Sequence, residues 1–238
     1  MAVESETGFG GFHGLTKMTI HLKENTIGAP NGASFFMKCT GIYMGLLEDA
    51  ANAWNTMQNR KYYLLLGRAG KSEEFTLSFH PRMFPHLAGF QYLNDIDLGI
   101  HRSEIFNGKL ISKILSGKIK TEDILKSEKW ENIKGRLLGI VELENTLDSQ
   151  FLIHRFDPSR VPHGSLIEAN YVIKNIKSGV TFFVFIDEKN NEWFCRSIFR
   201  MEQTDYTINQ ARLTVLKKEK YIDEKLIFSY THPNYKKS

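Results

Sequence analysis

The sequence predicts an α+β protein in which an N-terminal helix and a β-hairpin precede a helical insert and a mainly antiparallel sheet. Apolar residues recur every three or four positions in the first half of the chain and alternate with polar residues in short runs after Phe151. With 42% hydrophobic and 12% aromatic residues, the 238-residue chain can bury a substantial core. Because no linker divides the chain, we expect a single domain over residues 18–226.

The two ends of the chain are expected to lie outside that domain. Residues 1–17 are glycine-rich and aperiodic, which is typical of a disordered leader or a cloning remnant, and residues 227–238 are expected to form a polar tail. No apolar run is long enough to cross a bilayer, and Glu4 and Glu6 occupy positions where a secretion signal would be basic. We therefore expect no membrane association.

The first predicted element is an amphipathic helix over residues 34–58, weakened by Gly41 and Gly45. The runs "KYYLLL" and "EFTLSF" then predict a β-hairpin. Their connection, "LLLGRAGKS", is superficially like a phosphate-binding loop. Such a loop needs glycine where this chain has Leu65, and it must open a helix, whereas alternating strand residues follow Ser72. A nucleotide cradle is not expected here.

A helical insert is predicted over residues 102–146, after a turn-rich segment that contains "FHPRMFPHLAGFQYLND". Ser103 is placed to cap the first helix of the insert, and Thr121 opens another turn, with Glu122 and Asp123 at its positive end. Five strand-like runs follow: "FLIHRF", "LIEANYVI", "VTFFVFID", "EWFCRSIF" and "RLTVLKKEKY". The turns between them are too short for crossover helices, so the sheet should be largely antiparallel.

His86 is the most unusual local feature of the sequence. It follows Pro85 in a turn directly after a strand, and Gly89 nearby permits close approach of the backbone. A histidine in such a turn can exchange protons with a substrate near neutral pH. The alternative is a histidine that caps the turn or hydrogen-bonds a carbonyl. His80 invites a metal-site interpretation with His86, but the spacing matches no common zinc motif.

A second group of polar residues lies around the run "WFCRSIF". Strand alternation predicts two faces, formed by Trp193, Cys195, Ser197 and Phe199 on one side and by Phe194, Arg196 and Ile198 on the other. One of Arg196 and Ser197 must therefore face the packed side, unless that side is a cleft. Asp205, Thr207 and Gln210 follow in a turn, where Asp205 and Thr207 could equally serve as a helix cap.

Taken together, these segments resemble the phage-associated branch of the barnase–EndoU–colicin–RelE-like (BECR) nucleases. The resemblance extends from about Ser34 to Lys220 and rests on an ordered series of segments: "EFTLSF", "MFPHLAGFQYL", "ISKILSGKIKTEDILKSEKWENIKGRLLGIVELE", "LIEANYVI", "TFFVFI", "CRSIF" and "DYTINQARLTVLKKEK". Ala88 and Lys217 depart from the family pattern, which has Thr and Tyr at these positions.

The resemblance implies a BECR-like fold and a metal-independent ribonuclease that needs no cofactor. Such an enzyme drives the ribose 2′-hydroxyl onto the adjacent phosphate and leaves a 2′,3′-cyclic phosphate, which requires proton transfer and donors to the phosphoryl oxygens. It implies His86 as general acid or base and Arg196 or Lys218 as the fixed cation. The implied hydrogen-bond donors to phosphate are Ser197, Thr207 and Gln210.

The implied partner is RNA, with an immunity or host protein as a second class of partner, and the implied role is that of a toxin or an effector in phage–host conflict. A net charge of +4 permits RNA binding without demanding it. Two alternatives stay open: a non-catalytic phage or mobile-element protein that grips a host protein or RNA, and a metal-dependent hydrolase built around His80 and His86. Only Cys39 and Cys195 occur, too few for a disulfide framework, so a reduced cytoplasmic protein is expected.

Overall fold

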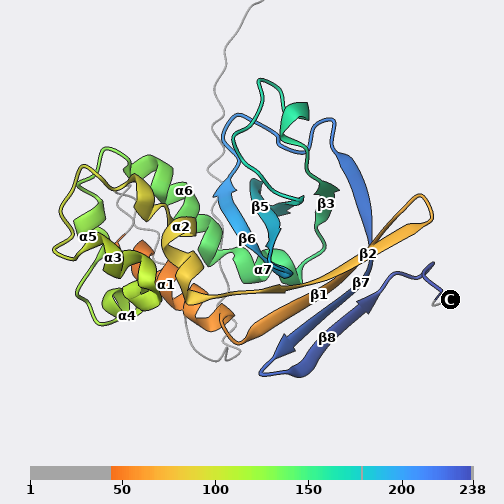
Figure 1. Cartoon of the computed structure of the whole chain (residues 1–238), viewed down its shortest axis with the longest axis horizontal. Helices are drawn as coiled ribbons and strands as arrows, with labels where there is room; N and C mark the ends of the chain where they lie inside the picture. The colour runs from red at the N-terminus through yellow and green to blue at the C-terminus, as the bar shows by residue number, and fades with distance from the viewer. Residues whose placement is uncertain (1–43, 178, 237–238) are drawn as a thin grey trace, which may run out of the picture. The chain divides into compact units, whose positions relative to one another are not determined.

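The computed structural model describes residues 44–177 and 179–236, which form helices at one end and a strongly curved sheet at the other (Figure 1). The α-helices are α1 (Leu46–Met57), α2 (Phe84–Ala88), α3 (Arg102–Glu104), α4 (Leu110–Leu115), α5 (Thr121–Ile124), α6 (Trp130–Val141) and α7 (Leu143–Asp148). Shorter helical turns are η1 (Pro81–Met83), η2 (Phe90–Tyr92), η3 (Ile105–Lys109) and η4 (Pro158–Arg160). The strands are β1 (Arg60–Arg68), β2 (Lys71–Ser78), β3 (Leu152–Arg155), β4 (Tyr171–Lys177), β5 (Val180–Lys189), β6 (Glu192–Arg200), β7 (Ala211–Ile222) and β8 (Lys225–Thr231).

The sheet closes on itself. Its strand order is β1-β2-β6-β5-β4-β3-β7-β8, and β1 also pairs with β7, so seven strands form a ring to which β8 is added at the edge of β7. The pairings are antiparallel except between β2 and β6, which meet in parallel at the single pair Leu77–Trp193. The predicted α+β class, with a helical insert before a mainly antiparallel sheet, is confirmed.

Both predicted hairpins form, and their turns explain why. The β1–β2 turn places Ala69 and Gly70 at φ of 50° and 77°, and the β5–β6 turn places Asn190 and Asn191 at φ of 55° and 64°. Two successive residues with positive φ make the tight turn whose twist matches that of the flanking strands. Glycine and asparagine adopt this conformation at low cost, so these turns fix the register of the strands on either side.

The helices differ from expectation at their starts. α1 begins after Gly45, which has a φ of 81°, and residues 34–43 of the predicted first helix lie outside the described residues, as do residues 1–17. Ser103 is not the cap of the first insert helix: the side chain of His101 accepts a hydrogen bond from the Ser103 backbone N–H and takes that role. Sequence spacing alone did not show which of His101 and Ser103 caps the helix.

The predicted polar tail also needs correction. Residues 227–231, its first five, belong to β8, which pairs with β7 from Lys217–Thr231 to Ile222–Lys225. The turn between β7 and β8 has Asp223 and Glu224 at positive φ (48° and 62°), a hairpin signal without glycine or asparagine. Most residues of β8 are exposed, which explains why the sequence predicted a polar tail here.

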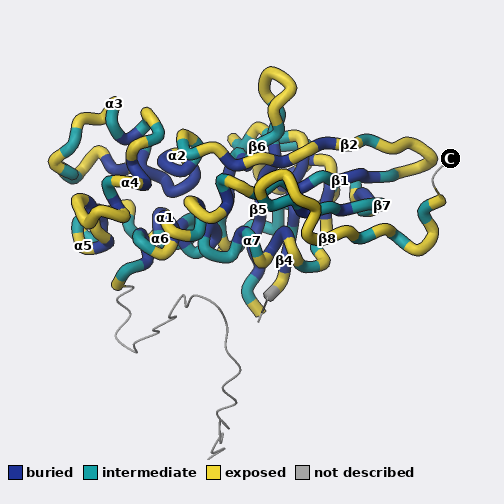
Figure 2. The backbone as a smooth tube through the Cα atoms, turned by 90° about the horizontal axis from the view of Figure 1, so that it is seen from below, coloured by how far each residue is buried: buried dark blue, intermediate teal, exposed yellow. Residues whose placement is uncertain are grey.

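The apolar residues form two clusters on opposite faces of the curved sheet. The larger cluster joins the helices to one face and includes Trp54, Leu64, Ile140 and Ile198. The smaller one lies on the other face and consists of Phe156, Val161, Val172, Phe183 and Phe185, with Phe199 and Tyr206 packed against it. Figure 2 shows the buried backbone running through both the helical end and the strands. In the part of the chain that the structure describes, no helix combines the length and apolarity needed to span a membrane.

The approach of α6 to β6 gives a test of this packing. A Cβ added at Gly139 would lie 2.8 Å from Cγ1 of Ile198, whereas a Cβ at Gly135, one helical turn earlier, would meet nothing within 4 Å. We expect Gly139→Ala to lower the free energy of unfolding by about 1–3 kcal/mol through overpacking. Gly135→Ala should raise it by about 0.5–1 kcal/mol because alanine restricts the unfolded chain. Urea denaturation measures both, and changes of the same sign in the two variants would contradict this packing.

Candidate active site

The candidate site lies where β2 and β6 separate. The two strands share a single pair, Leu77–Trp193, and beyond that point α2 and α6 contact β6 in place of a neighbouring strand. Figure 1 shows these two helices beside β6 at the junction of the helical end and the sheet. Side chains from both helices therefore reach the edge of β6, which no other described strand covers there.

A β-bulge in β6 sets the direction of Arg196 and Ser197. Phe185 pairs with Ser197 and Ile186 with Cys195, so Arg196 is an extra residue with no partner on β5. The bulge interrupts the alternation of the strand, because Cys195 and Ile198 both join the larger core cluster. The predicted grouping of Cys195 with Ser197 on one face is therefore wrong. The question of which residue faces the packed side is resolved by the bulge: Ser197 is buried, whereas the Arg196 side chain is 40% exposed.

His86 lies on α2, the short helix that the sequence placed in a turn. Pro85 is at the helix start and Gly89, with a φ of 87°, ends it. The His86 side chain is exposed, and its pKa is lowered below the ordinary value by partial burial of the ring and by the positive charges of Arg196 and Arg136. Both arginines therefore lie close enough to act on the imidazole. α2 packs against both α6 and β6, so His86 and the β6 bulge lie in the same region although they are more than a hundred residues apart in sequence.

Arg136, on α6, is the residue that the sequence interpretation missed. Its Nη1 donates a hydrogen bond to Ser197 Oγ (3.2 Å), and its guanidinium lies 5.3 Å from the ring centroid of Tyr92 and 5.8 Å from that of Phe199. Burial lowers the pKa of Arg136. No described carboxylate forms an ion pair with it. A partly buried guanidinium without an anion is unfavourable unless a ligand supplies the negative charge.

Gly89 makes room for this arginine. A Cβ at Gly89 would lie 3.1 Å from Cδ of Arg136 and 3.4 Å from Cδ2 of Tyr92. The positive φ and the close approach both favour glycine at this position. The motif "HLAG" therefore does two things: it ends the helix that carries His86, and it lets the Arg136 side chain pass beside that end.

Arg136 opens into a hollow of about 540 Å³. Tyr92, Phe199 and Tyr206 supply aromatic walls, and Arg200, Glu202, Gln203, Asn132 and Thr204 add polar groups. A hollow of this size with aromatic walls and a few convergent polar groups is typical of a ligand site.

Comparison with known proteins identifies the family of the chain. A profile of the family described as phage-Barnase-EndoU-ColicinE5/D-RelE like nuclease 4 matches residues 46–236. The chain belongs to this nuclease family. No curated protein and no solved structure matches the chain. The resemblance drawn from the sequence segments is thus confirmed, and the chain is a nuclease of the BECR type.

The other predicted residues of the nuclease are engaged elsewhere. Gln210 accepts a hydrogen bond from the Asp157 backbone N–H and donates one to the Asp157 carbonyl, both at 2.9 Å, so its amide fastens two segments of chain together. Thr207 donates its hydroxyl to Asp205 at 2.6 Å within a turn, and no described helix follows for the two residues to cap. Neither Gln210 nor Thr207 lines the hollow beside Arg136, and the walls of that hollow do not include His86, Arg196 or Ser197 either.

Lys218 lies on β7, separated from β6 by two strands in one direction around the ring and by three in the other. Its ammonium group donates to the carbonyls of Leu147, Asp148 and Ser149 at 2.8, 3.0 and 2.7 Å, which satisfies the C-terminal end of α7. Burial lowers the pKa of Lys218 to about 8. The structure therefore does not bring Lys218 to the candidate active site of the nuclease.

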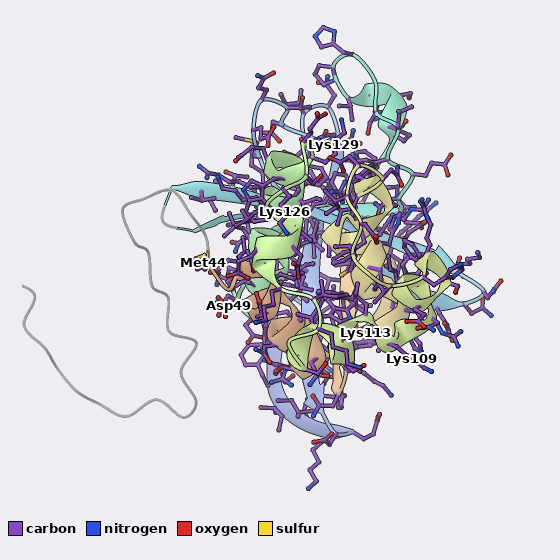
Figure 3. The ribbon with its side chains drawn as sticks, turned by 90° about the vertical axis from the view of Figure 1, so that its left-hand side faces the viewer. Met44, Asp49, Lys109, Lys113, Lys126 and Lys129 are labelled. Atoms are coloured by element: carbon purple, nitrogen blue, oxygen red, sulfur yellow. The ribbon has the colours of Figure 1, made fainter. Side chains whose placement is uncertain are left out.

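Basic side chains of the helical insert form a solvated surface of the nuclease rather than a site. Figure 3 labels Lys109, Lys113, Lys126 and Lys129 on this end of the protein. Lys113 pairs with Glu104, and Lys126 lies 3.9 Å from Asp123. Exposed pairs of this kind contribute little to stability or binding.

Neither thiol chemistry nor a histidine-based metal site finds support in the geometry. Cys195 is buried in the larger core cluster, and burial raises its pKa to about 12, which makes its thiol a poor nucleophile at neutral pH. Among the described residues, no three His, Cys, Asp or Glu side chains gather as metal ligands would. His80 instead accepts a hydrogen bond from the Arg82 backbone N–H and caps η1.

The electrostatic coupling of His86 to the bulge gives a direct test. Arg196→Gln removes one of the positive charges that lower the pKa of His86, so we expect that pKa to rise toward its ordinary value. An NMR titration of the His86 ring protons measures the change. Arg160→Gln is the control, since the Arg160 guanidinium is 3.1 Å from Asp157 and is not among the groups that shift His86. An unchanged His86 pKa in Arg196→Gln would contradict the proximity of the two side chains.

Proposed function

We propose that this nuclease cleaves single-stranded RNA without a metal ion, by attack of the ribose 2′-hydroxyl on the adjacent phosphate. The products are a 2′,3′-cyclic phosphate and a 5′-hydroxyl. The observation that carries the proposal is the convergence of His86, Arg196 and the Arg136–Ser197 pair beside an aromatic hollow. A proton acceptor next to two cations is the combination that this reaction requires.

His86 acts as the base in this scheme. Its lowered pKa keeps the imidazole neutral at pH 7, so it can accept the proton of the 2′-hydroxyl. The O2′–phosphorus bond forms as the phosphorus–O5′ bond breaks. The departing 5′ oxygen then takes a proton from solvent while the Arg196 guanidinium offsets its charge.

Arg136 and Ser197 bind the phosphoryl oxygens. The planar guanidinium can donate two parallel hydrogen bonds to a phosphate, and burial strengthens this interaction relative to water. Ser197 accepts a hydrogen bond from Arg136 through Oγ, which leaves the serine hydroxyl proton available for a phosphoryl oxygen. Because negative charge grows on these oxygens during the reaction, preorganised donors stabilise the transition state more than the bound substrate.

Tyr92, Phe199 and Tyr206 supply stacking surfaces for the bases. Aromatic stacking contributes about 1–3 kcal/mol per base and tolerates any base sequence. It also requires bases that are not already stacked in a duplex, which favours loops, ends and unpaired strands. The family's association with phages supports a further proposal, that the enzyme is an effector or toxin of phage–host conflict, which an immunity or host protein would hold in check.

The role of His86 is tested by His86→Asn in the full chain. We expect RNA cleavage to fall about 10²- to 10⁴-fold, the range for loss of a general base. His163→Asn is the matched control, because His163 is exposed in a loop and its positive φ of 66° suits asparagine. Cleavage is measured with a labelled single-stranded RNA, the cyclic phosphate is detected by mass spectrometry, and urea denaturation verifies that both variants fold. Retention of cleavage in His86→Asn would remove His86 from the mechanism.

The role of the Arg136 guanidinium is tested by Arg136→Lys, which keeps the charge and loses the planar pair of donors. We expect kcat to fall about 10- to 100-fold with a smaller change in KM, because the hydrogen bonds removed are strongest in the transition state. Lys134→Arg is the control. It exchanges one basic side chain for another on the same helix, and Lys134 does not line the hollow. A change confined to KM would contradict transition-state binding by Arg136.

A further inference from the structure

A second hollow, of about 680 Å³, lies on the far side of the ring from β6. It opens where β3 and β8 both border β7: β3 pairs with the start of β7 (residues 211–213), and β8 pairs with the end (residues 217–222). The segment 148–152, which links α7 to β3, supplies another wall. Because β3 and β8 pair with different parts of β7, a gap remains between these two strands. This gap forms the hollow.

One cation without a described partner lies in the polar part of this hollow. Its walls include three basic residues, but Lys174 is bound by Asp205 and Lys218 by three backbone carbonyls, and the carboxylate of Asp148 is bound by Lys220 and the Tyr62 hydroxyl. The third, Arg212, is exposed, and no described residue forms a hydrogen bond or ion pair with its guanidinium. The hollow therefore contains a cation that is free to bind an anion.

His154 provides an independent observation next to Arg212. The two residues pair directly in the β3–β7 register, so their side chains share one face of the sheet. His154 is only 7% exposed, and its Nδ1 has no hydrogen-bond partner among the described residues. Burial, with the nearby charge of Arg212, lowers the pKa of His154. His154 is not part of the wall of the hollow, but its neighbour Arg212 is, so a buried polar atom without a described partner lies directly beside the unpaired guanidinium.

Aromatic rings line the same hollow. Phe151, Phe228 and Tyr230 belong to its wall, and the exposed fraction of Phe228 is 44%. The Lys218 ammonium lies 5.0 Å from the ring centroid of Phe151 and 5.6 Å from that of Phe228, which keeps these two rings at fixed positions. Aromatic rings interleaved with basic side chains are the combination that binds single-stranded nucleic acid through its bases and phosphates.

One segment connects the two hollows. Thr204 and Tyr206 line the hollow beside Arg136, and the residue between them, Asp205, binds the Lys174 ammonium at 2.5 Å in the wall of the second hollow. The Tyr206 ring packs edge-on against Phe183 and Phe185, which fixes this segment to the face of the sheet. The segment 204–206 therefore lies between the two hollows, and a strand that occupies both would cross it.

We propose that the second hollow binds a single-stranded nucleic acid, as a subsite for nucleotides outside the scissile pair. The subsite rests on the proposed function in that the strand it holds is the RNA cleaved beside His86. Arg212 binds a phosphate, and the rings of Phe228 and Tyr230 stack with a base. Its contribution grows with the length of the strand, since a dinucleotide at the active site does not reach it.

The test is binding and cleavage by Arg212→Gln in the full chain. The binding probe is a fluorescein-labelled 12-nucleotide single-stranded DNA, which lacks the 2′-hydroxyl and cannot be cleaved by the proposed reaction. We expect its affinity to fall about tenfold, the effect of removing a charged hydrogen bond. The slope of log K against log salt should decrease by about 0.7 for each phosphate that the protein no longer neutralises. Cleavage of a dinucleotide RNA should stay within about twofold of wild type.

Two further variants show whether a loss of binding comes from the second hollow. Phe228→Ala should also weaken binding of the 12-nucleotide probe, because it removes a stacking ring that is already partly exposed. Arg102→Gln, which alters an exposed arginine of the helical insert bonded to Asn94, is the matched control and should bind like wild type. Urea denaturation establishes that all three variants fold.

The outcomes separate this subsite from the proposed active site. Unchanged binding of the probe by both Arg212→Gln and Phe228→Ala overturns the subsite, even where His86→Asn abolishes cleavage. Equal losses in dinucleotide cleavage and in probe binding would also overturn it, because the hollow would then belong to the catalytic centre. Weakened probe binding with full dinucleotide cleavage supports the subsite, and it does so whether or not His86 proves to be the base.

Discussion

The site depends on one constraint: the guanidinium of Arg136 is held partly buried without a described carboxylate to neutralise it. Burial of a charge is costly, and a folded protein usually offsets that cost with an ion pair. Here the compensation within the protein is small, consisting of the hydroxyl of Ser197 and the faces of Tyr92 and Phe199. In the proposed function, this residual cost is recovered when a phosphate binds beside Arg136.

The geometry around Arg136 follows from two backbone irregularities. The bulge at Arg196 turns Ser197 toward Arg136 while Ile198 stays in the core against α6. The left-handed conformation of Gly89 ends α2 and leaves space for the Arg136 side chain. Without the bulge, regular alternation would place Cys195 and Ser197 on the same face of the sheet. Ser197 could then not both pair with Phe185 on β5 and accept the hydrogen bond of Arg136. The polar groups of the site are therefore positioned by departures from regular structure, which is common next to active sites.

This dependence explains what the sequence could predict. Hairpins with asparagine or glycine turns, amphipathic helices and the antiparallel order follow from local rules, and each of these was predicted correctly. His86 was identified because a proline and a glycine flank it. The bulge was not predictable, since "FCRSIF" alternates normally in sequence and only pairing with β5 reveals the extra residue. Arg136 was missed because an arginine within "WENIKGRLLGIVELE" looks like a solvated helix residue until β6 is placed against it. Lys218 and Gln210 were assigned to the site by the resemblance, and their structural roles were not foreseeable because their carbonyl partners lie about 70 and 53 residues away in the chain.

The two hollows differ in the kind of binding energy that each can provide. Arg136 is partly buried and bound to Ser197, so its donors are oriented before substrate arrives, and they act where charge develops during the reaction. Arg212 is exposed and has no described partner to orient it, so in the proposed subsite it would bind the phosphates of substrate and transition state equally. Uniform binding of that kind lowers KM without raising kcat, whereas preorganised binding raises kcat. The two proposals therefore assign the two tasks to different parts of the ring: the chemistry to the helices and the bulged strand β6, and the affinity for longer strands to the opposite edge at β7 and β8.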